Sequence, residues 1–318
     1  MEKKQKYVSR QHGFFYELKR HKGMFLLLLP GFIYLLINNY LPMLGMIIAF
    51  KRINRLGGNI LDTYIHSPWV GFKNFNFFFK TKDAWIITRN TVLYNLTFII
   101  MGIILAVLVA IVLNEIKSKV LVKFYQTSIM LPGFLSWVVI SGIGYAFLTN
   151  NGLINTALKA MGHDTVNFYS EPAYWPFILT SIQLWYNLGV GSVMYLAALT
   201  SVSPDFYEAA AIDGASKWQQ IKNISIPFLK PTIITMALIS LGGIFSANFG
   251  LFYNIPRESG VLFNVTNVID TYVYRALRTT GMPEMATAAS VYQSVVGFVV
   301  VVLSNRLIKK VSPDNAMF

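Results

Sequence analysis

The residues best suited to chemistry are neutral polar and aromatic side chains set within long apolar runs. They are Asn95, Gln183, Trp185, Tyr186, Asn187, Ser246, Asn248, Phe249 and Tyr253. Aromatic faces combined with amide groups are the usual lining for a sugar, which has apolar C–H faces and hydroxyls that need hydrogen bonds. We therefore expect these residues to line a substrate pore. The alternative is that the amides and hydroxyls join neighbouring helices by hydrogen bonds.

Other reactive groups are missing from the sequence. The chain has no cysteine, which excludes disulfides, thiolate metal sites and cysteine nucleophiles. Its four histidines lie outside the apolar runs and show no metal-ligand spacing. Phosphate-cradling glycine loops and serine hydrolase elbows are absent, and no acid or base lies deep within an apolar run, where an ion-driven carrier usually needs one. We expect no catalytic residue, metal site or cofactor in this chain, so another chain must power any active transport.

A polar, helix-prone stretch from Glu208 to Pro227 separates two apolar runs. Before it, Ser203-Pro204-Asp205 predicts a helix start, since the hydroxyl caps free N–H groups and the acid favours the positive end of the helix. This helix should end near Gly214, because glycine readily adopts the left-handed conformation. Ser216 predicts a second short helix, ended by Pro227. Helices this short need packing, either on a partner or on the protein's own surface.

The surrounding elements are those of a membrane protein. Of the 318 residues, 54% are hydrophobic and 13% charged, whereas a soluble domain carries about 25% charged residues. Six apolar runs reach or approach the length that crosses a bilayer. They lie at about residues 23–50, 91–114, 124–148, 174–200, 230–252 and 285–305. We predict an all-α polytopic protein with six transmembrane helices, the first made irregular by Pro30, Pro42 and the Asn38-Asn39 pair.

The charge distribution orients the spans. The net charge of +13 fits a membrane protein whose basic segments stay in the cytoplasm. Six crossings place both termini on one side, and the density of Lys and Arg is higher when that side is the cytoplasm. The loop at 203–227 then lies in the cytoplasm. The aromatic stretch Trp69–Phe79 predicts a short helix at the outer membrane boundary, or a loop packed on the outer ends of the spans.

The stretch from Glu208 to Pro227 resembles the signature loop of the permease subunits of type I ATP-binding-cassette importers. That pattern is Glu-Ala-Ala, three residues, Gly, nine residues, Ile, one residue, an aliphatic residue and Pro. Its positions are held here by Glu208, Ala209, Ala210, Gly214, Ile224, Ile226 and Pro227. The flanking segments 213–218 and 226–231 are similar to carbohydrate-uptake permeases of the maltose type. The segments 69–75 and 270–275 resemble the branch that handles oligosaccharides, uronate-containing glycans and complex polysaccharide fragments.

The resemblance implies a type I importer permease fold with cytoplasmic coupling helices. It implies a multi-pass protein of the bacterial inner (plasma) membrane, surrounded by lipid, with both termini cytoplasmic. The expected partners are a second homologous permease, two cytoplasmic ATPase subunits that bind ATP and Mg, and an extracytoplasmic sugar-binding protein that delivers an oligosaccharide. No nucleic acid partner is expected. The residues assigned to ATPase coupling are Glu208, Ala209, Ala210, Asp213, Gly214, Ile224 and Pro227.

The chain divides accordingly into four regions. Residues 1–22 are a basic cytoplasmic segment, and 23–87 hold the first transmembrane helix and the external aromatic loop. Residues 88–307 form the permease core with transmembrane helices 2–6 and the coupling loop 203–227, and 308–318 are a cytoplasmic tail. The loop Phe252–Asn264 departs from the family pattern, which leaves the specificity open.

Three alternatives remain at this point. The chain is a permease for another solute in the same importer class, a stand-alone secondary carrier, or a membrane-embedded enzyme acting on glycans. A substrate carrying uronates is a further hypothesis, because the first external loop is rich in basic residues. These are Lys51, Arg52, Arg55, Lys73, Lys80 and Lys82.

Overall fold

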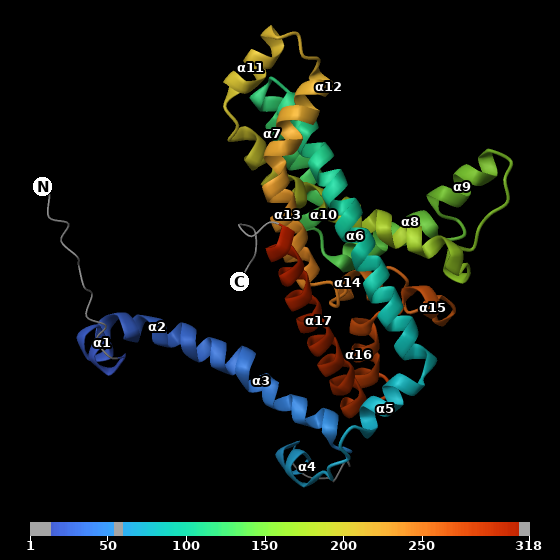
Figure 1. Ribbon diagram of the computed structural model, residues 1–318. Coiled ribbons are helices and arrows are strands. Elements are labelled where there is room, and N and C mark those ends of the chain that lie inside the picture. Colours follow the sequence, from blue (N-terminus) through green and yellow to red (C-terminus); the bar gives the residue numbers. More distant parts are fainter. Residues whose placement is uncertain (1–13, 54–59, 312–318) are drawn as a thin grey trace, which may run out of the picture.

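The computed structural model describes residues 14–53 and 60–311, and these segments are helical except for turns, loops and one isolated bridge between Lys51 and Trp69 (Figure 1). The first half of the chain holds α1 (Phe14–Arg20), α2 (Lys22–Leu35), η1 (Leu36–Tyr40), α3 (Leu41–Met43), η2 (Leu44–Phe50), α4 (Ile60–His66), α5 (Lys73–Lys80), α6 (Lys82–Glu115), α7 (Lys119–Met130), η3 (Leu131–Phe134), α8 (Trp137–Leu148) and α9 (Leu153–Ala160). The second half holds η4 (Phe168–Ser170), η5 (Pro172–Tyr174), α10 (Trp175–Thr200), α11 (Pro204–Ile212), α12 (Lys217–Gln220), η6 (Ile221–Ser225), α13 (Ile226–Gly242), α14 (Phe249–Asn254), η7 (Gly260–Leu262), α15 (Phe263–Thr266), α16 (Ile269–Arg278) and α17 (Pro283–Val311).

Five of the described helical segments are long and apolar enough to cross a membrane. They are Lys22–Phe50, Lys82–Glu115, Trp137–Ala160, Lys217–Gly242 and Pro283–Arg306. Helix α10 is not among them, but its 26 residues make it about 39 Å long at 1.5 Å per residue, which exceeds the hydrocarbon thickness. The prediction of an all-α membrane protein is confirmed, with α10 as the most polar of the six predicted spans.

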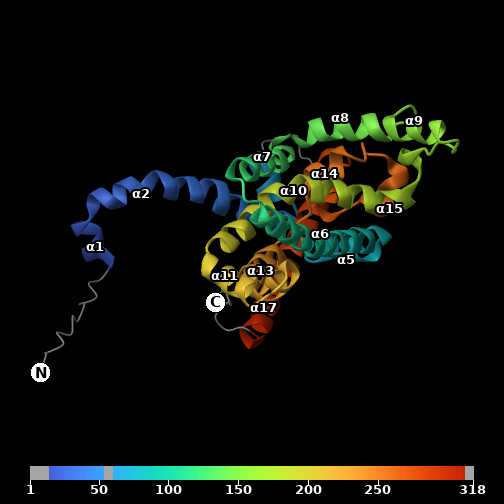
Figure 2. The ribbon, with the colours of Figure 1, turned by 90° about the horizontal axis from the view of Figure 1, so that it is seen from above.

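Helices α6 and α10 form the centre of the molecule, and α13 packs against both (Figure 2). A cluster of buried residues on these three helices, including Ala110, Leu199 and Leu229, forms one core. A second core joins α10 to α8 and α14 around Trp175 and Leu251. A third joins α5, α6, α16 and α17. The core that contains Ala110, Leu199 and Leu229 holds α10 in a fixed relation to α6 and α13.

The helix α10 passes unusually close to the end of α7. A Cβ atom added at Gly189 would lie 2.5 Å from the carbonyl oxygen of Ile129 and from the Cα atom of Met130. Both are backbone atoms, so no side-chain movement could relieve the contact. Glycine is therefore required at this crossing.

Two of the predicted spans are broken in the structure. The run at 124–148 is divided between α7 and α8 by the segment Leu131–Ser136, which contains Pro132 and Gly133. The run at 230–252 is divided between α13 and α14 by residues 243–248, which follow Gly242. Continuous helices were therefore the wrong prediction at both places. Proline removes a backbone donor and glycine weakens a helix, and the apolar side chains around them conceal both effects in a hydropathy pattern.

The first span stands apart from the rest of the described chain (Figure 1). None of the residues in its most apolar window is buried, and it contacts the body through η2, which packs against α17 and α5. Its predicted irregularity is confirmed, because a π-helical turn spans Leu36–Tyr40 and a 3-10 helix ends the segment at Phe50.

The aromatic stretch that follows the first span contains most of α5. Phe78 is buried against α17 and ring contacts join it to Tyr272 and Tyr292. Lys51 is also buried, and its ammonium group donates to the carbonyls of Tyr64 and Ile65 at 2.6 and 3.2 Å. Lys51 is thus committed to holding the loop together and is not free to attract a ligand. Arg55 and residues 1–13 and 312–318 lie outside the described part of the chain.

Candidate functional site

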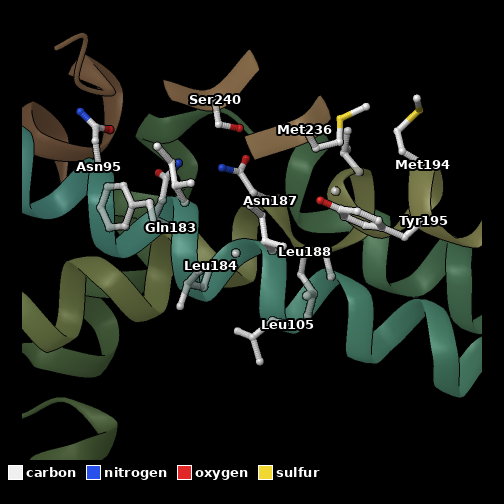
Figure 3. A pocket seen from close by; sticks show the side chains of 17 residues that line it. Asn95, Leu105, Gln183, Leu184, Asn187, Leu188, Met194, Tyr195, Met236 and Ser240 are labelled. Carbon is white, nitrogen blue, oxygen red and sulfur yellow. The ribbon is translucent and has the colours of Figure 1, made fainter. Parts of the chain in front are cut away.

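A cavity of about 450 Å³ lies between α6, α10 and α13 (Figure 3). Its polar lining comes from five residues, Asn95, Gln183, Asn187, Tyr195 and Ser240. The rest of its wall is apolar and includes Phe98, Met194 and Met236. None of the 17 lining residues is charged. Such a volume with a few neutral hydrogen-bonding groups suits an uncharged polar face of a small ligand, such as the hydroxylated face of a sugar ring.

Helix spacing explains which residues face this cavity. Gln183 and Asn187 are four residues apart and so share one face of α10, whereas Trp185 lies on another. Small residues at Gly102 and Gly191 bring α6 and α10 close together, since a Cβ added at Gly191 would lie 3.6 Å from the Cβ of Ala106. Three of these five polar residues, Asn95, Gln183 and Asn187, were predicted from the sequence to line a pore. Tyr195 and Ser240 were missed, although Ser240 is a polar interruption of an apolar run.

The remaining residues proposed for the pore lie elsewhere. Trp185 lines a separate, almost wholly apolar cavity of about 270 Å³ against α8. The ring of Tyr186 lies 4.3 Å from that of Trp137 and belongs to the core. Phe249 and Tyr253 stack on each other at 4.9 Å and both contact Tyr274 of α16. Ser246 and Asn248 lie in the break between α13 and α14 and border the cavity without lining it.

Two of the three amide side chains of the cavity, Asn95 and Gln183, are held by the break at residues 243–248. The Asn95 Nδ2 group donates to the carbonyls of Ile244 and Ser246 at 2.9 and 3.3 Å. The Asn248 Nδ2 group donates to Gln183 Oε1 at 3.2 Å, while its Oδ1 accepts from the backbone N–H of Leu251 and caps α14. Both sides of the cavity are therefore connected to the same non-helical segment.

The loop at 203–227 forms two short helices at one end of the molecule (Figure 1). Ser203 caps α11 as predicted, Gly214 has a φ of +79°, and Ser216 caps α12 in a capping box with Gln219. Pro227 does not end the second helix, which was the wrong prediction. The helix continues through the π-helical turn η6 into α13, because a π turn widens the backbone ahead of Pro227, where a regular turn would meet the proline ring.

The surface of this loop is apolar and open. Phe206, Ile212 and Trp218 are exposed, Ile212 to 86%. Of the residues assigned to coupling, five are exposed and Ala210 and Ile224 are half-buried. A 2.8 Å ion pair between Lys217 and Glu115 ties the loop to α6. Within the loop, a 3.1 Å hydrogen bond between Tyr207 and Ser225 joins α11 to η6. Since α12 runs on into α13, the loop is mechanically joined to two helices that line the cavity.

The loop Phe252–Asn264, which departs from the family pattern, is strained and tightly anchored. Arg257 and Glu258 both have a φ of +54°, which is unfavourable for residues other than glycine. The Arg257 guanidinium lies 4.3 Å from the centre of the Tyr145 ring, and Glu258 forms a 3.0 Å ion pair with Arg275. Burial lowers the pKa of Arg275 from its ordinary value, and the Glu258 carboxylate opposes that shift. The loop thus links α8 to α16.

Comparison with known proteins gives one family for residues 99–313, the binding-protein-dependent transport system inner membrane component. Protein LplB of Bacillus subtilis (strain 168) is 32% identical over 299 residues, which cover 94% of this chain and 92% of that protein. The polygalacturonan/rhamnogalacturonan transport system permease protein YteP of the same organism is 34% identical over 307 residues, covering 94% and 91%.

The fold matches that of a chain from an importer whose crystal structure is known. A chain in the crystal structure of a bacterial ABC transporter involved in the import of the acidic polysaccharide alginate superposes with a TM-score of 0.84. Its sequence identity to this chain is 31%, and the match covers 94% of this chain and 99% of that one. A second structure of the alginate transporter, in complex with alginate pentasaccharide-bound periplasmic protein, gives a TM-score of 0.82 at 31% identity.

Proposed function

The chain belongs to the family of binding-protein-dependent transport system inner membrane components, and from this premise we propose that it is the permease subunit of an ATP-driven oligosaccharide importer. It forms half of the translocation pore, and a second homologous permease forms the other half. Two cytoplasmic ATPase subunits bind ATP and Mg and supply the energy, and an extracytoplasmic binding protein delivers the sugar. The relatives that transport polygalacturonan, rhamnogalacturonan and alginate support a polysaccharide fragment as the substrate.

The observation that carries the proposal is the continuity between the cavity and the open loop. Met236 and Ser240 of α13 line the cavity, and α13 runs back through η6 into α12. An ATPase that binds the apolar surface of Phe206, Ile212 and Trp218 would therefore move the cavity wall directly. Rocking of such helices alternates access to a site near the middle of the membrane.

Four of the seven coupling residues have individual roles in this proposal. Glu208 lies in α11 and is exposed, so it meets a basic or polar group of the ATPase. Ala209 and Ala210 permit close approach because they carry no bulk. Gly214 makes the turn between α11 and α12 with its positive φ. The loop then lies in the cytoplasm, and with six spans both termini lie there too.

The test is purification of the tagged chain from its native membrane followed by reconstitution. We expect an ATPase and a second permease to be recovered with it, and uptake of an oligosaccharide to require both ATP and the binding protein. Uptake by the purified chain alone, without ATP, would show a stand-alone carrier and overturn the proposal. Glycan cleavage by the purified chain would show an enzyme.

The charge of the substrate is tested in the same system. The cavity has no charged lining residue, so it binds the neutral groups of a sugar. The exposed basic residues of the first external loop attract acidic sugars only from a distance. We expect acidic oligogalacturonides to compete better than neutral malto-oligosaccharides at low salt, with the difference shrinking at high salt. Equal competition at every salt concentration would remove the uronate hypothesis.

A further inference from the structure

The break between α13 and α14 exposes backbone groups that a continuous helix would satisfy. Residues 243–248 have no regular helical pairing, apart from short turns, and lie between two helical parts of one predicted span. At membrane depth an unpaired N–H or C=O group is costly, so irregular backbone persists there only when protein groups pair with it or it lines a cavity. Side chains that form hydrogen bonds with the backbone of residues 243–248 are therefore needed to stabilise the break.

Side chains from three other helices supply those partners. Asn95 of α6 donates to the Ile244 and Ser246 carbonyls. Gln293 of α17 donates its Nε2 to the Phe245 carbonyl at 2.7 Å. Asp270 of α16 accepts the backbone N–H of Ala247 at 2.7 Å, and also accepts from Gln293 at 3.3 Å. Together they fix the position of the next residue, Asn248.

These contacts decide which atoms the cavity presents to a ligand. A carbonyl oxygen only accepts, so Asn95 must turn its nitrogen to the break and leave Oδ1 for the cavity, as Figure 3 shows. The side-chain oxygen of Asn248 caps α14, so its nitrogen faces Gln183 and donates a hydrogen bond to Oε1. Gln183 then has its nitrogen left for the cavity. The cavity thus holds one acceptor and one donor in assigned places.

We propose that Asp270 and Gln293 are positioning residues for sugar selectivity, which act by holding the break so that Asn95 presents an acceptor and Gln183 a donor to substrate hydroxyls. This role rests on the proposed sugar transport. It adds that Asn95 accepts a hydrogen bond from the substrate and that Gln183 donates one. Neither positioning residue lines the cavity. Their effect passes through the backbone of residues 244–247 and through Asn248.

The sharpest test reverses one contact. In Asn248→Asp the carboxylate still caps α14 but only accepts, so Gln183 must turn its nitrogen toward residue 248 and present its oxygen to the cavity. The wild-type complex, with ATPase and binding protein, is assayed with monodeoxy and monodeoxyfluoro analogues of maltotriose and digalacturonate. Fluorine accepts weakly but cannot donate. At the hydroxyl that Gln183 contacts, wild type should therefore transport the fluoro analogue about threefold better than the deoxy analogue.

In Asn248→Asp this difference should disappear, because the hydroxyl must then donate. The matched control is Asn264→Asp, the same chemical change at an exposed residue whose side chain makes no hydrogen bond in the described structure. The control should keep the wild-type difference. If Asn248→Asp also keeps it while assembling normally, the assigned polarity is wrong and the proposal falls.

A second variant tests the positioning residues themselves. Asp270→Asn preserves shape but sets an N–H₂ group against the N–H₂ of Gln293, so the hold on Phe245 and Ala247 weakens. We expect KM for uptake to rise about tenfold, discrimination between fluoro and deoxy analogues to fall, and the maximal rate to change less than twofold. Asp83→Asn, an exposed carboxylate on α6, is the control and should leave both quantities unchanged.

The outcomes separate this inference from the proposed function. Failure of the wild-type complex to take up any sugar would contradict the proposed function. Normal uptake with an unchanged KM and unchanged analogue discrimination in Asp270→Asn would overturn the inference alone. Should Asp270→Asn fail to assemble with the ATPase, Asn248→Asp and Gln293→Leu provide the same readout from the other members of the network.

Discussion

At the residue scale, the residues of α10 that face the cavity can be recognised by combining their polarity with their position along the helix. Gln183 and Asn187 face the cavity and Trp185 does not, and a period of 3.6 residues would have separated them from the sequence alone. The orientation of the amides could not be predicted, because it depends on Asn248 and on residues of α16 and α17 that are distant in sequence. The contribution of Tyr195 was equally hidden, since its ring is also part of a buried core.

One prediction separates the two faces of α10. Asn187→Ala should raise KM for sugar uptake about fivefold or more, because a hydrogen bond to the substrate is lost. Trp185→Ala removes a side chain from a different cavity, so it should leave KM close to wild type and lower thermal stability instead. Uptake at varied sugar concentration by the purified complex, together with its melting temperature, checks both. The reverse pattern would place the substrate on the face of Trp185.

At the element scale, three helix ends in the loop at 203–227 were predicted correctly because they are encoded locally, whereas the end predicted at Pro227 was wrong. Caps at Ser203 and Ser216 and the positive φ of Gly214 depend on neighbouring residues. The breaks at 131–136 and 243–248 depend on contacts from other helices. The dipeptides Pro132-Gly133 and Gly242-Gly243 indicate that a helix is interrupted there. They do not show which groups form hydrogen bonds with the backbone that the interruption leaves unpaired.

Gly214→Val should abolish ATP-dependent transport by weakening the attachment of the ATPase. A β-branched residue at a φ of +79° is strained by about 1 to 3 kcal/mol, so the turn between α11 and α12 would change shape. The matched control is Gly162→Val, which carries the same strain at a φ of +78° after α9. We expect loss of ATP-dependent uptake and of ATPase recovery in the first variant only. Equal loss in both would reduce the effect to general destabilisation.

The close crossing of α10 over α7 gives a second prediction at this scale. Gly189→Ala places a methyl group against backbone atoms of Ile129 and Met130, and such overpacking costs about 1 to 3 kcal/mol. The melting temperature of the detergent-purified protein should fall. Gly142→Ala in α8 meets nothing within 4 Å, and should raise stability by about 0.5 to 1 kcal/mol because alanine favours a helix. An unchanged melting temperature in Gly189→Ala would mean that α7 and α10 lie farther apart.

At the scale of the whole molecule, composition and the number of apolar runs predicted the class, and the resemblance predicted the fold. Both are confirmed. The placement of the first span was beyond prediction, because its main contacts with the described body are those of η2 with α17 and α5, and it leaves an apolar surface along Lys22–Ile47. A hydropathy pattern records that a helix is apolar and not which neighbour, lipid or protein, covers it.

The topology can be tested directly because the chain has no cysteine. Single cysteines are introduced at Ile212, exposed at the end of α11, and at Val261, exposed in η7. In sealed right-side-out vesicles an impermeant maleimide should label Val261→Cys and spare Ile212→Cys until the membrane is opened. In inverted vesicles the pattern should reverse. Labelling of both residues from the same side would contradict the six-span arrangement.

The polarity of α10 has a further consequence, for the way the chain is built into the bilayer. The amides that line the cavity also make α10 less apolar than the five segments that meet the length and hydropathy of a span, and polar residues at mid-depth make insertion of a single helix unfavourable. Its earlier neighbour α6, packed against it along much of its length, offers the newly made helix a surface other than lipid. The order of synthesis, with α6 made before α10, thus lets the most polar span enter the membrane against a partner already in place.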